Sequence, residues 1–202
     1  MGIRILHWVG GRARRLTLRT ALEVVAAALV LTACGQQVDL ADQRARQLMR
    51  IWETGDSGVL DEIASPDIVY DDVPNGERFE GLDGVRRYVG HVHSWASQVE
   101  ITVVAVHSGS DGAVVEWVMR GVQNRPIPGR VPLATNRPFE LKGVTLVVLR
   151  DGRITRAADY IDVLGFVVQL GSRVELPGGV VIPPDSEAAQ QGDAPAGARR
   201  RR

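Results

Sequence analysis

Two long hairpins in the second half of the chain constrain its fold more than any other feature. Four segments alternate between apolar and polar residues and are rich in β-branched side chains: 99–107, 113–122, 139–150 and 153–161. The first two are joined by Gly109-Ser110-Asp111-Gly112, and the last two by the tight turn Asp151-Gly152. Strands joined by such short turns pair antiparallel. The sequence therefore predicts an antiparallel meander, interrupted by a long loop over residues 123–136.

Helical patterns surround this meander. Apolar residues recur at spacings of three and four in four segments: 39–53, 57–64, 82–95 and 163–170. We expect Asp39 to cap the first helix, Ser65-Pro66-Asp67 to form a turn, and a strand to run from Ile68 toward Pro74. Leading helices followed by strands indicate the α+β class, with the helices on one face of a bent sheet. A curved sheet closed by helices encloses a cavity, which is the default binding site.

The N-terminus is typical of an exported protein. Five arginines precede an apolar run over residues 21–33, which is broken by Glu23 and is too short for a membrane-spanning helix of about 20 residues. The residues Leu31-Thr32-Ala33-Cys34 resemble a bacterial lipobox. That resemblance implies cleavage before Cys34 and a lipid on its sulfur. We therefore predict a signal peptide over 1–33, a lipidated linker over 34–38, and anchoring at the extracytoplasmic face of the cell membrane.

Composition limits the remaining chain. From Cys34 onward it carries 19 basic and 23 acidic residues, a net charge of −4, which gives no electrostatic footprint for nucleic acid. Residues 176–202 are rich in Gly, Pro, Ala and Gln and are predicted to be a disordered tail. The tail ends in four arginines, 199–202, which are either a solvated end or a contact for anionic lipid headgroups or a cell-wall polymer. The predicted folded domain is therefore 39–175.

Several short stretches along this domain resemble one known superfamily. They are Val69–Pro74, Phe79–Val85, Val115–Trp117, Asp151–Ile154, Asp159–Asp162 and Gln169–Gly171. Their order resembles the NTF2-like superfamily, in its branch of SnoaL-like polyketide cyclases, with limonene-epoxide hydrolase as a more distant relative. The resemblance implies a cone in which a curved, mixed sheet wraps around helices and an internal cavity. It also implies a possible homodimer through the open sheet face.

The epoxide-hydrolase chemistry does not carry over. Its Arg and second Asp positions fall on Trp117 and Met119, so the acid and base pair that opens an epoxide is missing. The Tyr and Asn positions of that family fall on Tyr70 and Asp72, and its catalytic Asp falls on Asp159.

Three aspartates and a tyrosine are the catalytic candidates. A carboxylate in an apolar pocket has a raised pKa, which suits proton transfer. Asp72 and Asp159 are candidates for such a pair, with Tyr70 donating a hydrogen bond to an enolate oxygen. The alternative is that both carboxylates are paired structurally or solvated at the cavity mouth. The cyclase branch uses an aspartate near Asp162, but this residue precedes the last helix and is equally suited to be its N-cap.

The expected ligand-binding residues are mostly aromatic. Trp117 and Met119 share one strand face, and Trp52 and Trp95 are core residues that in this fold also line a cavity for a flat, apolar ligand. We expect His91 at the cavity mouth. A metal site is not predicted, because His91 and His93 lie two apart on a helix and face different sides. No cofactor is predicted.

The sequence leaves three functions open. The first is a lipid-anchored domain that binds a small, largely apolar molecule. The second is a cofactor-independent isomerase, cyclase or dehydratase that uses the cavity aspartates. The third is a non-catalytic, dimerising interaction module. A uniformly apolar cavity favours the first, a desolvated aspartate at the end of the cavity favours the second, and a cavity filled by its own side chains favours the third.

Overall fold

The computed structural model describes residue 37 and residues 39–183, and the chain has the predicted α+β fold. A helix over residues 39–54 comes first. The later elements are α2 (Leu60–Ile63), β1 (Ala64–Asp72), the 3-10 helix η1 (Val73–Asn75), β2 (Glu77–Glu80), α3 (Gly81–Trp95), β3 (Ala96–Gly109), β4 (Gly112–Gln123), β5 (Arg137–Arg150), β6 (Arg153–Ile161), α4 (Val163–Gln169), β7 (Val174–Glu175) and β8 (Val181–Ile182).

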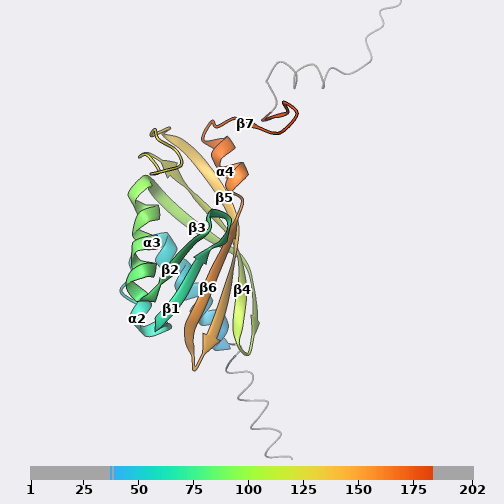
Figure 1. Ribbon diagram of the computed structural model, residues 1–202. Helices are drawn as coiled ribbons and strands as arrows, with labels where there is room; N and C mark the ends of the chain where they lie inside the picture. The colour runs from blue at the N-terminus through green and yellow to red at the C-terminus, as the bar shows by residue number, and fades with distance from the viewer. Residues whose placement is uncertain (1–36, 38, 184–202) are drawn as a thin grey trace, which may run out of the picture. The chain divides into compact units, whose positions relative to one another are not determined.

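Six strands form one mixed sheet in the order β2-β1-β6-β5-β4-β3 (Figure 1). The two predicted hairpins are present as β3–β4 and β5–β6, and β4 pairs with β5 across the loop over residues 124–136. β1 runs parallel to β6, and β2 folds back on its outer edge. The parallel pairing brings the end of β1 beside the last residues of β6.

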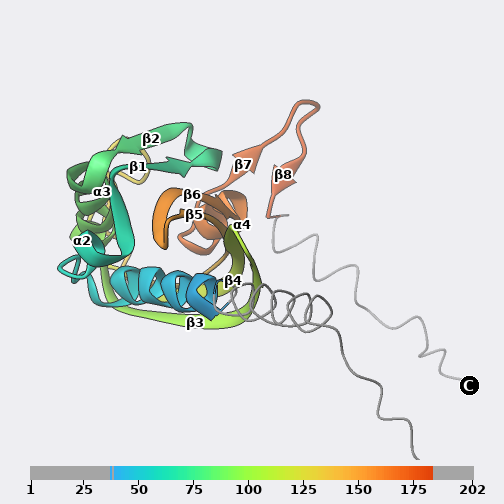
Figure 2. The ribbon, with the colours of Figure 1, turned by 90° about the horizontal axis from the view of Figure 1, so that it is seen from below.

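The sheet is strongly curved, and irregular pairing explains the curvature. The register of β3 against β4 shifts between Ser97 and Glu100 and again between Val103 and Ala105. Such bulges bend a strand and increase its twist. Figure 2 shows the sheet curling around the helix over residues 39–54, with α3 closing the same concave side.

The core lies between these helices and the concave face. The first helix buries Ala41, Ala45, Leu48, Met49 and Trp52, the face that its apolar spacing predicted. On β4, Val115, Trp117 and Met119 are buried, whereas Glu116 and Arg120 are exposed. The predicted alternation of this strand is therefore confirmed, and its inward face supplies part of the cavity wall.

Three local expectations need correction. Asp39 lies inside the first helix, which already includes residue 37, so it is not the N-cap. The short helix predicted over 57–64 is only α2. Residues 65–67 belong to β1, but they are looped out of the pairing with β6, because Ala64 pairs with Ile154 and the next pair joins Val69 to Arg156.

The structure also bears on the C-terminal tail. Residues 177–183, expected to be part of a disordered segment, contribute the turn and second strand of the β7–β8 hairpin. Residues 184–202, the predicted signal peptide and Cys34 lie outside the described residues. Within the described part of the chain, no helix is long and apolar enough to cross a membrane.

Candidate functional site

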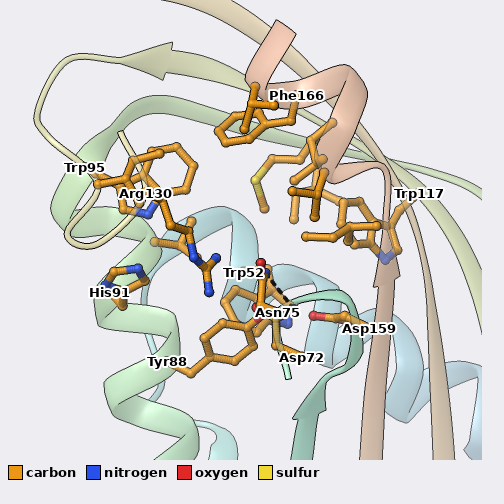
Figure 3. Close-up of a pocket in the computed structure, with 18 of the residues that line it drawn as sticks. Trp52, Asp72, Asn75, Tyr88, His91, Trp95, Trp117, Arg130, Asp159 and Phe166 are labelled. Atoms are coloured by element: carbon orange, nitrogen blue, oxygen red, sulfur yellow. Dashed lines mark hydrogen bonds between the residues drawn. The ribbon is translucent and has the colours of Figure 1, made fainter. Parts of the chain in front are cut away.

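A cavity opens between the concave face of the sheet, the first helix, α3, α4 and the loop after β4. Apolar side chains make most of its wall, and six polar or charged residues interrupt it: Asp72, Asn75, Tyr88, His91, Arg130 and Asp159 (Figure 3). The centre of a water-sized sphere can occupy about 80 Å³ of this space. One water needs about 10–15 Å³ on that scale, so the cavity holds on the order of five to eight waters or a comparable small organic group.

Asp159 of β6 presents one carboxylate oxygen to the protein and the other to the cavity. Only 5% of the residue is exposed. Its Oδ1 accepts hydrogen bonds from Thr145 Oγ1 at 2.6 Å and from the Tyr70 hydroxyl at 3.0 Å. No donor among the described residues bonds Oδ2, and Oδ2 is not completely buried. Oδ2 is therefore the oxygen that meets a bound molecule.

Two tryptophans fix the direction of these hydrogen bonds. Trp117 Nε1 donates to Thr145 Oγ1 at 2.8 Å, and Trp52 Nε1 donates to the Tyr70 hydroxyl at 3.0 Å. An indole nitrogen is only a donor, so each hydroxyl must accept from its tryptophan and turn its own proton toward Asp159. Both arms therefore hold Oδ1 as an acceptor, and a proton bound by this carboxyl sits on Oδ2, facing the cavity.

The surroundings set the proton affinity of this carboxyl. Burial raises the pKa of Asp159 to about 7, against the lowering effect of the Thr145 and Tyr70 hydrogen bonds, and the nearby charge of Asp72 raises the pKa further. A group with this pKa is present in both protonation states near neutral pH. It is suited to act as a general base and then as a general acid.

Asp72 is the second buried carboxylate of the site. The parallel register places it directly beside Asp159 on the neighbouring strand. Asn75 Nδ2 lies 2.8 Å from each carboxylate oxygen of Asp72, a contact drawn in Figure 3. η1 makes this contact possible, because it turns the chain immediately after β1 and ends at Gly76, whose φ of 67° suits glycine.

Tyr70 has a different position from the one we expected. It is fully buried behind Asp159, and its single proton is committed to that carboxylate, so it orients Asp159 and does not line the cavity. The tyrosine on the cavity wall is Tyr88 of α3. Burial raises the pKa of Tyr88 well above its usual value, and the charges of Asp159 and Asp72 and a hydrogen bond to Asp72 raise the pKa further. Tyr88 therefore stays protonated, and it donates to Asp72.

Asp162 caps α4 and is not part of the cavity wall. Its Oδ1 accepts a hydrogen bond from the Gly165 backbone N–H at 2.8 Å, and the residue is exposed. The N-cap interpretation is therefore the one that the geometry supports, and the catalytic role considered for Asp162 has no structural basis.

The other predicted ligand-binding residues lie together. Trp52, Trp95, Trp117, Met119 and His91 all line the cavity. Sequence reasoning missed Thr145, Asn75 and Arg130. Unlike His91, His93 is not part of the cavity wall, and its Nε2 is hydrogen-bonded to the Trp52 backbone oxygen at 2.9 Å. Across residues 39–183, no three His, Cys, Asp or Glu side chains are grouped so that they could hold a metal ion.

Several solved structures of other proteins are similar to this chain in fold. Similar solved structures include TsrD from Streptomyces laurentii, with 26% identity, a TM-score of 0.59, and coverage of 66% of this chain and 96% of that one. IdmH from Streptomyces antibioticus, a candidate polyketide cyclase, has 22% identity, a TM-score of 0.57 and coverage of 65% and 99%. A limonene-epoxide-hydrolase-like enzyme from M. tuberculosis has 16% identity, a TM-score of 0.52 and coverage of 66% and 90%.

Sequence comparison assigns the family. No curated protein matches the chain at the stringency applied. The sequence profile of the SnoaL-like domain matches residues 45–157, from the first helix to the middle of β6, and so spans most of the cavity wall and the Tyr70 and Thr145 partners of Asp159. This match covers more than half of the chain, and the protein therefore belongs to the SnoaL-like domain family.

Proposed function

We propose that the domain is a cofactor-independent enzyme in which Asp159 moves a proton on a small, mostly apolar molecule. The observation that carries the proposal is a buried carboxyl whose pKa is raised to about 7, with Oδ1 fixed by two donors and Oδ2 facing the cavity. Abstraction of a proton from the carbon next to a carbonyl is the step common to isomerases, aldol-type cyclases and dehydratases. The family includes polyketide-cyclase-like proteins, which is consistent with this class of reaction.

The residues divide the work as follows. Ionised Asp159 accepts a proton from the substrate carbon at Oδ2, while Tyr70 and Thr145 stabilise the charge on Oδ1 beforehand. The electron pair of the broken C–H bond moves to the carbonyl oxygen. Tyr88, protonated on the cavity wall, turns its hydroxyl from Asp72 to that oxygen and donates to it. Asp159 then returns the proton to a different carbon or to a leaving oxygen, which completes the cycle without a cofactor.

The other two candidate functions have less support. A pure binding site needs no desolvated carboxylate, and an interaction module would have its cavity filled by Trp117, Met119 and their neighbours. A carboxylate with a raised pKa also lowers stability near neutral pH, which is common where function requires it.

The homodimer stays a prediction, which sedimentation of the purified domain tests.

Hydrogen exchange tests the proposed chemistry without knowledge of the substrate. We expect the protein to accelerate deuterium exchange of the benzylic protons of phenylacetone in D₂O, followed by proton NMR. The rate should rise with pH and level off above about 7, because the ionised form of Asp159 is the base. Asp159→Asn should reduce the acceleration by about 10²–10⁴-fold. The matched control Asp162→Asn, at the exposed N-cap, should keep it. Wild-type exchange no faster than buffer, or equal rates for Asp159→Asn and wild type, would refute the proposal.

We also propose that the domain acts outside the cytoplasm, anchored by a lipid on Cys34. The basic and apolar leader and the lipobox-like residues support this location. An exported enzyme would meet its substrate outside the cytoplasm, so the closure of a nascent polyketide is not the reaction we favour. Labelling of cells with an alkyne fatty acid should tag the wild type in the membrane fraction and leave Cys34→Ala untagged. An untagged wild-type protein would contradict the anchor.

A further inference from the structure

A second depression adjoins the mouth of the cavity. It lies between β2, α3 and the loop after β4, and it measures about 400 Å³ on the scale used above. His91 and Arg130 line both the depression and the cavity, so the two spaces meet at these side chains. Arg78 and Arg87 are its other basic residues, and Glu77 is the acidic residue of its wall. Of the two spaces, the inner one is mostly apolar and the outer one is rich in guanidinium groups.

The positive charge of the depression is only partly neutralised. Arg130 pairs with Glu77 at 3.1 Å. Arg78 bonds Asp71 at 2.8 Å, but the same carboxylate also serves Arg156 at 2.9 Å. Asp71 thus divides one negative charge between two guanidinium groups.

Arg87 contributes a positive charge that no ion pair of the described chain neutralises. It is exposed and makes no ion pair with any residue of the described chain. The charge of Glu80 also acts on Arg78. Three arginines and one glutamate line the depression, so guanidinium groups outnumber carboxylates there, and Arg87 is the exposed arginine that has no ion pair within the described chain.

The charges inside the cavity fix the orientation of a ligand. Asp72 and Asp159 lie at the inner end, and Arg130 reaches toward them from the mouth (Figure 3). An anionic group is repelled by the two carboxylates and attracted by the guanidinium groups. A molecule with an anionic group at one end therefore binds with that end in the depression and its apolar part against Asp159.

We propose that the substrate is a small, apolar molecule with an oxyanion group, a carboxylate or a phosphate, held by Arg87 and Arg130 in the depression. This inference rests on the proposed function, because it names the class of molecule on which Asp159 acts. Guanidinium groups suit both oxyanions, since their planar donors match two oxygens at once. The inner volume matches a group about the size of one phenyl ring, with the oxyanion outside it.

Matched ligands test the inference by calorimetry at low salt. The probes are phenylacetate, benzylphosphonate and the neutral analogue 2-phenylethanol. We expect at least one anion to bind about 10-fold more tightly than the alcohol or better, because hydrogen bonds to charged groups are stronger than those between neutral groups. The preference should decline as salt rises. Which anion binds more tightly separates a carboxylate from a phosphate substrate.

Two variants locate the effect. Arg87→Met and Arg130→Met should each reduce the preference for the anion. Arg87→Met should leave 2-phenylethanol binding unchanged, because Arg87 lines only the outer depression. Arg87 makes no ion pair within the described chain, so its variant stays informative even if Arg130→Met disturbs the loop. Arg120→Met is the control, since Arg120 pairs with Glu140 on the outer face of the sheet and lines neither space.

Three results would overturn the inference. They are equal affinity for anions and alcohol in the wild type, a preference that survives in both arginine variants, and binding of none of the three probes. None of them decides the proton-transfer proposal, because the phenylacetone exchange assay uses an uncharged probe and depends on Asp159.

Discussion

Replacement of Asp159 by asparagine should stabilise the protein, and the gain should grow with pH. In the wild type the pKa of Asp159 is about 7 in the folded state, against 3.8 as the ordinary value. The folded state therefore holds the proton more tightly than the unfolded state. The contribution of the protonated carboxyl to stability is present below about pH 4 and is lost as pH rises through about 7. Asparagine does not ionise, so the variant has no such loss.

The size of the effect follows from the two pKa values. They differ by about 3 units, and each unit corresponds to about 1.36 kcal/mol, so ionisation of Asp159 costs the folded state about 4 kcal/mol. The unfolding free energy of the variant relative to the wild type should therefore increase by about 1.4 kcal/mol per pH unit between about pH 4 and 7. Above about pH 7 the difference should level off. A constant offset from the altered hydrogen bonds does not change this slope.

Urea unfolding at a series of pH values measures the slope. Asp162→Asn is the control, because Asp162 is exposed and asparagine is also a good N-cap, so its difference from the wild type should stay small throughout. Parallel stability profiles for Asp159→Asn and the wild type would refute the reasoning, since they would mean that Asp159 ionises as easily in the folded state as in the unfolded one.

Two further substitutions test the support of Asp159. Thr145→Val removes a hydrogen bond that lowers the pKa of Asp159, so the pH profile of phenylacetone exchange should move to higher pH. The substitution also leaves the Trp117 N–H unpaired, which should lower the unfolding free energy in urea by about 1–3 kcal/mol. A pH profile that does not move would contradict the hydrogen-bond network. Gly143→Ala places a Cβ in steric overlap with the Trp117 ring and should cost about 1–3 kcal/mol. In contrast, Gly90→Ala on α3, whose Cβ meets nothing within 4 Å, should stabilise by up to about 1 kcal/mol; equal thermal midpoints for the two glycine variants would contradict the packing argument.

Local patterns were sufficient to predict which side chains of β4 and β6 face the cavity. A strand has a period of two, so the alternation of β4 alone indicates that Trp117 and Met119 face the same side. The same reasoning separates buried Asp159 from Tyr160, which is 50% exposed. The tight turn at Asp151-Gly152 likewise predicts the β5–β6 hairpin, which the structure contains.

The partner of Asp159 on β5 was not predictable in this way. Arg150 pairs with Arg153 next to the turn, and a regular hairpin from that pair would place Thr145 opposite Ala158. The register shifts by one residue between Leu149 and Val148, so Thr145 is opposite Asp159 instead. A bulge of this kind depends on how the whole sheet bends, so a short stretch of sequence does not reveal it.

Two other site residues depend on contacts distant in sequence. Arg130 comes from the loop after β4, where no periodicity indicates the direction of a side chain, and its pairing with Glu77 of β2 joins residues far apart in the chain. Asn75 belongs to a Pro-Asn-Gly turn that sequence reasoning treated only as the end of a strand. The exchange of roles between Tyr70 and Tyr88 has the same origin, because only the folded structure shows which tyrosine faces the cavity.

Carboxyl ¹³C NMR of the aspartate-labelled domain tests the central claim most directly. Subtraction of the Asp159→Asn spectrum identifies the Asp159 signal, and its chemical shift is followed as pH is varied. A midpoint near 7 is expected, because burial and the neighbouring Asp72 charge outweigh the hydrogen bonds from Tyr70 and Thr145. A midpoint near 4 would mean that the carboxyl is solvated and would remove the basis for proton transfer in this cavity.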